Sequence, residues 1–216
     1  MTLPLLKRHF LALLLGTCLH AAQAAGEVPV FTERLADAAL LAQIQQGGFV
    51  LYMRHGTTDN SRADQAPRVD YKDCNTQRVL NDDGRKLARD VGLSMRRAKI
   101  PVGEVFHSPM CRARETAELA FPALIKQFQS NISLAYTANL TTEEKKPVLA
   151  ETRRLVSAPV AAGSNRLVVA HAPNLADLMG YFVKPEGTVV VIRPLGAQGY
   201  EYLGSIPPAL WSQLGK

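Results

Sequence analysis

The stretch LYMRHGTTDN, Leu51–Asn60, passes from an apolar run directly into Arg-His-Gly and then into polar residues. The run Phe49–Arg54 is short and apolar, which is typical of a strand that is buried on both faces of a sheet. Two adjacent basic side chains at the end of such a strand would not be stabilised by packing in an apolar core. We therefore expect Arg54 and His55 to bind an anion there.

Outward from this stretch, expected strands and helices alternate along the chain. The expected strands are Phe49–Arg54, Glu104–His107, Arg166–His171, Thr188–Arg193 and Gly199–Leu203, the last two forming an antiparallel pair around a turn that contains Gly196. The expected helices are Arg34–Gln46 before Gly47-Gly48, Asn81 to about Lys99, Cys111–Ala120, Thr141 to about Val156, and a short helix after Pro173-Asn174. This alternation predicts an α/β three-layer sandwich, with a mainly parallel sheet, helices on both faces and an antiparallel C-terminal strand pair.

Basic residues follow the ends of three of these strands. Arg54-His55 follows the first, a turn leads from the second to Arg112, and His171 ends the third. In open α/β sheets, ligands bind beyond the carboxyl ends of the strands. We therefore expect these four side chains to share one site, for which a phosphate is a fitting anion. His107 has no motif around it and is interpreted as a structural histidine.

Several motifs together resemble the histidine phosphatase superfamily, which has the phosphoglycerate-mutase-like fold. They are Arg54-His55-Gly56, Ser108-Pro109-Met110-Cys111-Arg112-Ala113 with Thr116-Ala117, Leu80-Asn81 with Gly84 and Ala88, and the strand-end His171. The resemblance extends over about residues 49–193. It implies that His55 is a nucleophile that forms a phosphohistidine, and that Arg54, Arg112 and His171 bind the phosphoryl oxygens.

Two departures separate the chain from the mutases of this family. Thr57 and Ser61 stand where those enzymes typically have Glu and Asn, and the interval between Arg112 and His171 is short and lacks their Glu-Arg pair. The resemblance is therefore closer to the short phosphatase type, and a mutase-type phosphotransferase is the weaker alternative.

A phosphate ester also needs a proton on its leaving oxygen, which a nearby carboxyl group usually supplies. Asp59, four residues after the nucleophile, is the first candidate. The alternatives are Asp64, Asp70, Glu151 and Glu186.

The segment 57–79 is predicted to be a long charge-balanced loop that selects the substrate. The substrate is expected to be a phosphorylated small molecule or envelope component. No cofactor or metal is expected, because the chain has no P-loop, dinucleotide motif or metal-ligand spacing. The net charge of +6 is spread along the chain, which argues against nucleic acid as a partner.

The N-terminus has the pattern of a secretory signal peptide. Lys7 and Arg8 precede a short apolar run, and Ala22-Gln23-Ala24 provides the cleavage site. Residues 1–24 are therefore predicted to be removed, with Ala25 as an alternative end, leaving 25–216 as one phosphatase-like domain in the periplasm. The alternatives are an ordinary N-terminal helix or a lipoprotein signal at Cys18. The apolar run is too short for a membrane span, which takes about 20 residues.

Two cysteines, Cys74 and Cys111, remain after removal of the signal peptide. An even number in an oxidising compartment favours a disulfide between them. The alternatives are two buried free thiols, or a reactive Cys111. For the protein as a whole, the sequence predicts a secreted phosphomonoester hydrolase, with a non-catalytic phosphate-binding protein as the rival.

Overall fold

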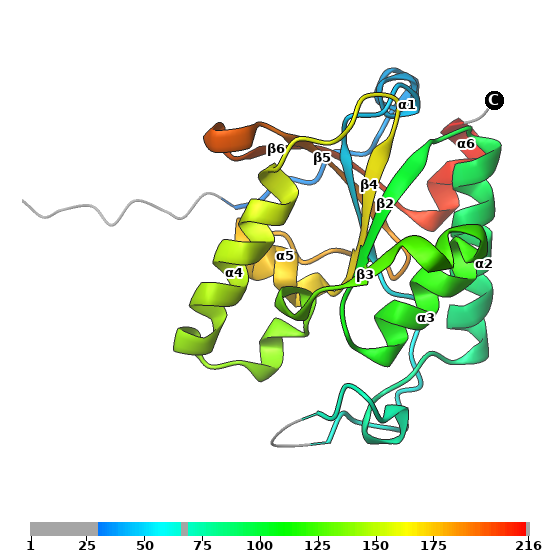
Figure 1. The fold of residues 1–216 in the computed structure, drawn as a ribbon. Coiled ribbons are helices and arrows are strands. Elements are labelled where there is room, and N and C mark those ends of the chain that lie inside the picture. The colour runs from blue at the N-terminus through cyan, green and yellow to red at the C-terminus, as the bar shows by residue number, and fades with distance from the viewer. Residues whose placement is uncertain (1–29, 66–68, 215–216) are drawn as a thin grey trace, which may run out of the picture.

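The computed structural model describes residues 30–65 and 69–214, and within these residues six strands form one sheet in the order β3-β2-β4-β1-β5-β6 (Figure 1). The strands are β1 Val50–Arg54, β2 Val102–His107, β3 Phe128–Ser130, β4 Asn165–Ala170, β5 Val189–Pro194 and β6 Tyr200–Ile206. The strands β3, β2, β4 and β1 run parallel to one another, whereas β5 is antiparallel to β1 and to β6. The predicted mainly parallel sheet with an antiparallel C-terminal pair is confirmed.

Helices cover both faces of this sheet, as predicted for three layers. They are α1 Ala38–Gln45, α2 Asp82–Arg97, α3 Cys111–Ala120, α4 Thr142–Ser157, α5 Ala172–Met179 and α6 Trp211–Leu214. Figure 1 shows α2 and α3 on one side of the sheet and α4 and α5 on the other.

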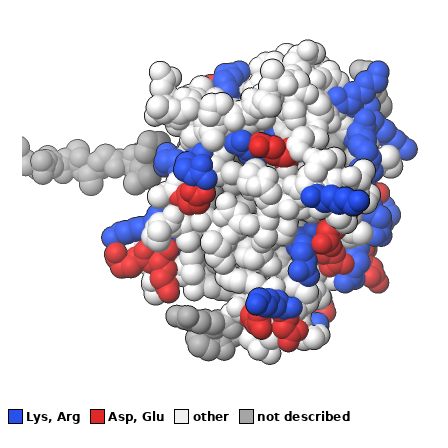
Figure 2. All heavy atoms as spheres, in the orientation of Figure 1, with Lys and Arg blue, Asp and Glu red and all other residues white. Residues whose placement is uncertain are grey.

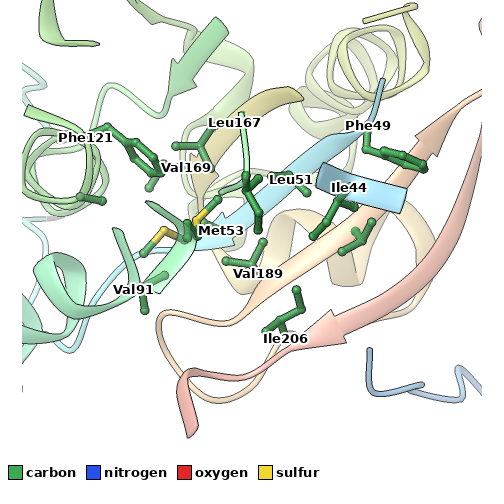
Figure 3. Packing of buried hydrophobic residues seen from close by; sticks show 14 of the residues in the cluster. Ile44, Phe49, Leu51, Met53, Val91, Phe121, Leu167, Val169, Val189 and Ile206 are labelled. Atoms are coloured by element: carbon green, nitrogen blue, oxygen red, sulfur yellow. The ribbon is translucent and has the colours of Figure 1, made fainter. Parts of the chain in front are cut away.

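Strand β1 is buried on both faces because its side chains alternate between two apolar clusters. Leu51 and Met53 pack in the cluster that includes Val91 of α2 (Figure 3), whereas Val50 and Tyr52 pack in the cluster beneath α4 and α5. All four strand side chains are fully buried. Full burial of a large apolar side chain contributes about 1.5–3 kcal/mol. This burial anchors the strand that carries the Arg-His-Gly motif.

The predicted helix start at Arg34 is wrong, because the segment before Ala38 pairs with β6 instead. The backbone N–H of Ala36 donates to the carbonyl of Ser205 at 2.9 Å, and the N–H of Ser205 donates to the carbonyl of Arg34 at 2.8 Å. The helix begins only after Asp37, whose side chain accepts a hydrogen bond from the N–H of Leu40 and caps the first turn.

Other boundaries differ by a few residues. Strand β2 begins at Val102 rather than at Glu104, and β6 extends to Ile206. Helix α5 begins at Ala172, before the predicted start after Pro173-Asn174. The three-residue strand β3 was not expected, since so short a run carries no periodicity. The predicted helix starts at Asn81 and Thr141 agree with the structure to within one residue: Asn81 caps α2, and Thr141 forms a capping box with Glu144 at α4.

The predicted long loop follows β1 and lies beyond the ends of the parallel strands, at the bottom of Figure 1. It contains the short 3₁₀ helix η1, Cys74–Thr76, and rejoins the fold where Thr58 pairs with Leu80. At this point the backbone of α2 approaches the motif very closely. A Cβ added to Gly84 would lie 1.9 Å from the carbonyl oxygen of Thr57, so only glycine fits.

Basic and acidic side chains neighbour one another on the face that Figure 2 shows, in keeping with the dispersed charge of the sequence. A bilayer-spanning helix would need a longer apolar run than any helix within residues 30–65 and 69–214 provides. The predicted signal peptide, residues 1–24, lies outside the described residues.

Candidate active site

The ends of β1 and β4 bring the two predicted histidines together. The rings of His55 and His171 are both buried, and their centroids lie 5.2 Å apart in an edge-to-face arrangement. The N–H of His55 donates to the carbonyl of Ala170 at 3.0 Å, so the chain continues the ladder of β1 and β4 up to the first histidine. The ends of β1 and β4 therefore lie together and bring His55 and His171 into one site, as predicted.

The surroundings of His55 hold its ring neutral with Nε2 unprotonated. Its Nδ1 lies 2.8 Å from the carbonyl oxygen of Gly56, which can only accept, so Nδ1 carries the proton. Burial is the largest cause that lowers the pKa of His55 to about 3, and the positive charges of Arg112 and Arg54 add to it. A neutral imidazole whose Nε2 keeps its lone pair is the form that can act as a nucleophile.

His171 is held by Ser108 and Tyr52. Its Nε2 lies 2.8 Å from Oγ of Ser108, and that oxygen also accepts a hydrogen bond from the N–H of Met110 at 3.2 Å. The Ser108 hydroxyl is therefore free to donate to Nε2, which would leave the proton on Nδ1 of His171. The Tyr52 hydroxyl accepts from the backbone N–H of His171 at 3.1 Å and donates to its carbonyl at 2.8 Å. Burial lowers the pKa of His171 well below its usual value, so the ring is neutral.

Arg112 enters the site from the first turn of α3 and is fully buried. Its two terminal nitrogens donate to the two carboxylate oxygens of Asp64 at 2.9 and 3.2 Å, and one of them also contacts the carbonyl of Arg78 at 3.3 Å. The ring of Tyr136 lies 5.1 Å from the guanidinium carbon. Burial lowers the pKa of Arg112 and Asp64 opposes this shift. The side chain remains a cation, as arginine does in proteins.

Arg54 is held in the same manner on the other side of the site. Its guanidinium pairs with the carboxylate of Glu186 and donates to the carbonyl of Val183 at 2.7 Å. The ring of Phe182 lies 5.8 Å from its guanidinium carbon. Both arginines thus have their terminal nitrogens occupied by the protein.

Three buried nitrogens of the four predicted residues have no hydrogen-bond partner: Nε of Arg54, Nε of Arg112 and Nδ1 of His171. A buried donor without a partner costs about 1–3 kcal/mol, more when it is charged. An oxyanion bound between these residues would supply the missing acceptors.

Within residues 30–65 and 69–214, no three or more His, Cys, Asp or Glu side chains are grouped as a metal site requires.

The Asp59 carboxylate is turned toward its own loop. Its Oδ1 accepts from the N–H of Ser61 at 2.9 Å and from the hydroxyl of Ser61 at 2.7 Å. These bonds are the main cause that lowers the pKa of Asp59, so it is ionised and holds no proton to donate. This geometry weighs against the predicted role as general acid, which stays a prediction.

The other candidate acids are also engaged elsewhere. Asp64 pairs with Arg112 and Glu186 with Arg54, as described above. Asp70 accepts from the N–H of Lys72 within the long loop, and Glu151 pairs with Arg154 on α4.

His107 has the structural surroundings that were predicted for it. Its Nδ1 contacts the carbonyl of Ser108 at 2.8 Å, and its ring packs against Phe128 of β3.

Two residues of the site carried no sequence signal for their position. Tyr136 lies between Arg112 and His171, with its ring centroid 5.3 Å from that of His171, but it comes from an irregular segment between short 3₁₀ turns. Gln77 accepts from the N–H of Cys111 at 2.8 Å and thereby ties the long loop to α3. By contrast, Thr116 belongs to a quoted motif, and its hydroxyl accepts from the N–H of Gly56 at 3.0 Å.

Cys74 and Cys111 form a disulfide, with their Cα atoms 5.8 Å apart, as predicted. The bond joins η1 in the long loop to the first residue of α3, next to Arg112. It therefore fixes the loop against the helix that supplies the buried arginine.

Comparison with known proteins finds one family model that matches residues 50–135, described as the histidine phosphatase superfamily (branch 1). Among solved structures, the protein histidine phosphatase SixA complexed with tungstate has a TM-score of 0.55 at 18% identity, over 74% of this chain and 97% of that chain. The ecdysone phosphate phosphatase EPPase from Bombix mori, in complex with tungstate, has a TM-score of 0.45 at 16% identity, over 74% of this chain and 92% of that chain. Among curated protein sequences, none matches the chain. The chain thus matches the model of the histidine phosphatase superfamily over residues 50–135 and shares its fold with the SixA structure.

Proposed function

We propose that this protein is a secreted phosphomonoester hydrolase of the short phosphatase type, which works through a phosphohistidine on His55. The observation that carries the proposal is the set of unpartnered buried nitrogens on Arg54, Arg112 and His171, next to a neutral His55 whose Nε2 is unprotonated. These nitrogens would donate to a bound oxyanion, and the nucleophile lies beside them.

Both arginines are suited to bind phosphoryl oxygens without giving up their carboxylate partners. In Arg112 the two terminal nitrogens hold Asp64, which leaves the edge with Nε for the substrate. In Arg54 the terminal nitrogens hold Glu186 and the Val183 carbonyl, and Nε is again free of a protein partner. Each guanidinium is thus positioned before the substrate arrives, which reduces the reorganisation required in the transition state.

The reaction has two displacement steps. In the first, Nε2 of His55 forms a bond to phosphorus while the ester P–O bond breaks, and the leaving oxygen takes up a proton from the solvent. In the second, water forms a bond to phosphorus and gives up a proton to the solvent while the P–N bond breaks, which releases phosphate and restores neutral His55. Arg54, Arg112 and the Nδ1 proton of His171 neutralise the charge on the phosphoryl oxygens in both steps.

Secretion is proposed from the N-terminal sequence pattern of residues 1–24. The Cys74–Cys111 disulfide supports it, because disulfides persist in oxidising compartments such as the periplasm. N-terminal sequencing of the exported protein tests this part: Ala25 or Gly26 at the start is expected, and an intact Met1 would contradict it.

The hydrolase is tested by turnover of an aryl phosphate in EDTA, with His55→Ala compared with wild type and with His107→Ala as the matched control. We expect wild type and the control to turn over the ester without added metal, and His55→Ala to lose activity. Activity that EDTA abolishes, or that His55→Ala retains, would contradict the mechanism.

A non-catalytic phosphate-binding protein is the second candidate. It is favoured by the engagement of Asp59 with Ser61, which leaves the first-choice proton donor ionised and turned away. Tight binding of inorganic phosphate without turnover of any phosphomonoester would support this candidate over the hydrolase.

A further inference from the structure

A pocket of about 610 Å³ lies beside the candidate active site. It is lined by Val69 and Tyr71 from the long loop, Met110 before α3, Tyr136, and Asn139, Leu140, Thr141 and Glu144 around the start of α4. Small-molecule sites typically have volumes of about 300–1,000 Å³, so this pocket is large enough for an organic ligand.

Two lining residues, Tyr136 and Met110, connect the pocket to the residues that are proposed to bind phosphate. The Tyr136 ring faces both His171, at 5.3 Å between ring centroids, and the guanidinium of Arg112, at 5.1 Å. The backbone of Met110 donates to Ser108, the residue that holds His171. A phosphate bound between Arg112 and His171 would therefore lie beside the pocket.

A third lining residue, Tyr71, is coupled to the site through the charge of Asp64. Burial is the main cause that raises the pKa of Tyr71, and the negative charge of Asp64, the carboxylate that holds Arg112, adds to it. The phenol remains protonated and can donate a hydrogen bond. The contacts between the pocket and the candidate active site run through Tyr136 and Met110, whereas Tyr71 senses the charge of Asp64.

The character of the walls selects the chemistry of the occupant. Tyr71 and Tyr136 contribute aromatic rings, Met110 a thioether, and Val69 and Leu140 aliphatic groups. Polar groups come from Asn139, Thr141 and Glu144 at the start of α4. Aromatic rings favour flat partners in stacked or edge-to-face contact, and a methionine sulfur also contacts aromatic rings favourably.

The disulfide links two segments that line the pocket. Val69 and Tyr71 lie a few residues before Cys74, and Met110 directly precedes Cys111. The bond therefore keeps the loop wall at a set position relative to α3, even though that wall belongs to a long loop.

We infer that this pocket is the subsite for the organic group of the phosphorylated ligand, and that it takes an aromatic ring between Tyr71 and Tyr136. The inference rests on the proposed function, because it assumes that the phosphate binds between Arg112 and His171. The expected substrates are phosphomonoesters of an aromatic alcohol rather than phosphomonoesters of a small polar alcohol.

The test compares 2-phenylethyl phosphate with ethyl phosphate. Both leave as primary alcohols, so the phenyl group changes what fills the pocket with little change in the leaving group. Burial of the ring is expected to raise kcat/KM about ten- to hundredfold for the phenylethyl ester. Tyr71→Ala and Leu140→Ala should each lower this ratio severalfold. Leu93→Ala, at an exposed leucine of α2, is the matched control and should preserve it.

Equal kcat/KM for the two esters in wild type, or an unchanged ratio in both pocket variants, would overturn the inference while the hydrolase stands. If neither ester is turned over, the proposed function fails, and the preference is then read from the Kd values of the corresponding phosphonates. A tighter Kd for 2-phenylethylphosphonate that Tyr71→Ala weakens would support the pocket as an aromatic subsite. Equal Kd values would overturn it.

Discussion

Asp64 holds the buried guanidinium of Arg112, so its replacement by asparagine should cost more stability than any exposed charge. Both carboxylate oxygens accept from Arg112, and Oδ1 also accepts from the N–H of Arg78 at 2.9 Å. The Arg112 side chain is 0% exposed and that of Asp64 is 12% exposed, so water cannot replace the lost carboxylate. Asparagine offers a single neutral acceptor for these donors.

Breaking a buried ion pair by removal of one partner costs about 3–5 kcal/mol. Because the asparagine amide can keep one of the hydrogen bonds, we expect the lower end, about 3 kcal/mol, for Asp64→Asn. In a chain of this size that loss lowers Tm by about 6–12 °C. The matched control is Asp90→Asn, which removes a pair with Lys86 whose side chains are 54% and 72% exposed. Exposed pairs of this kind contribute about 0.3–0.5 kcal/mol.

The assay is urea unfolding of wild type and both variants, with the slope of unfolding free energy against urea compared to exclude a change in the unfolded state. Steady-state turnover is measured on the same preparations, and Asp64→Asn should also lower kcat because Arg112 is no longer held. Equal urea midpoints for Asp64→Asn and Asp90→Asn would refute the role given to this ion pair.

Three further predictions follow from the same geometry. Arg112→Lys should lower kcat/KM about 10²–10³-fold, because lysine has no second edge for the phosphoryl oxygens. Arg114→Lys, two residues further along α3, should change kcat/KM little, and equal losses would contradict the role of Arg112. The pKa of His55 is lowered from 6.5 to about 3, so NMR should find its ring neutral at pH 5. The contribution of this group to folding stability should be complete above about pH 6.5 and should fall as the pH drops toward 3. A His55 titration near pH 6.5 would exclude that environment. The double variant Cys74→Ser/Cys111→Ser removes a disulfide of sequence separation 37. Its free energy of unfolding, measured in urea, should fall by about 3–4 kcal/mol, and a fall below about 1 kcal/mol would contradict the prediction.

The layout of the fold and the meeting of the four site residues could be predicted because both follow from local patterns. The apolar run before Arg54 required a strand buried on both faces, and parallel strands must present their carboxyl ends at one edge, which brings His55 and His171 together. The helix starts at Asn81 and Thr141 could be predicted for the same local reason.

What escaped prediction depends on contacts between distant segments. Helical periodicity extends back to Arg34, but pairing with Ser205 keeps the first residues extended. Tyr136 reaches the site from an irregular segment, where no repeat predicts the direction of a side chain. The partners of Asp59 and Asp64 were also unpredictable, since a loop aspartate can turn to its own backbone or to a buried arginine with the same sequence around it.

The most direct test of the central claim is to trap the phosphoenzyme. Wild type is mixed with a radiolabelled aryl phosphate, quenched in alkali during the first turnover, digested and examined by mass spectrometry. The mechanism predicts phosphate on His55 that is stable in base and lost in acid, absent in His55→Ala and retained in His107→Ala. Label on another residue, or turnover that proceeds in His55→Ala without a phosphoenzyme, would contradict it.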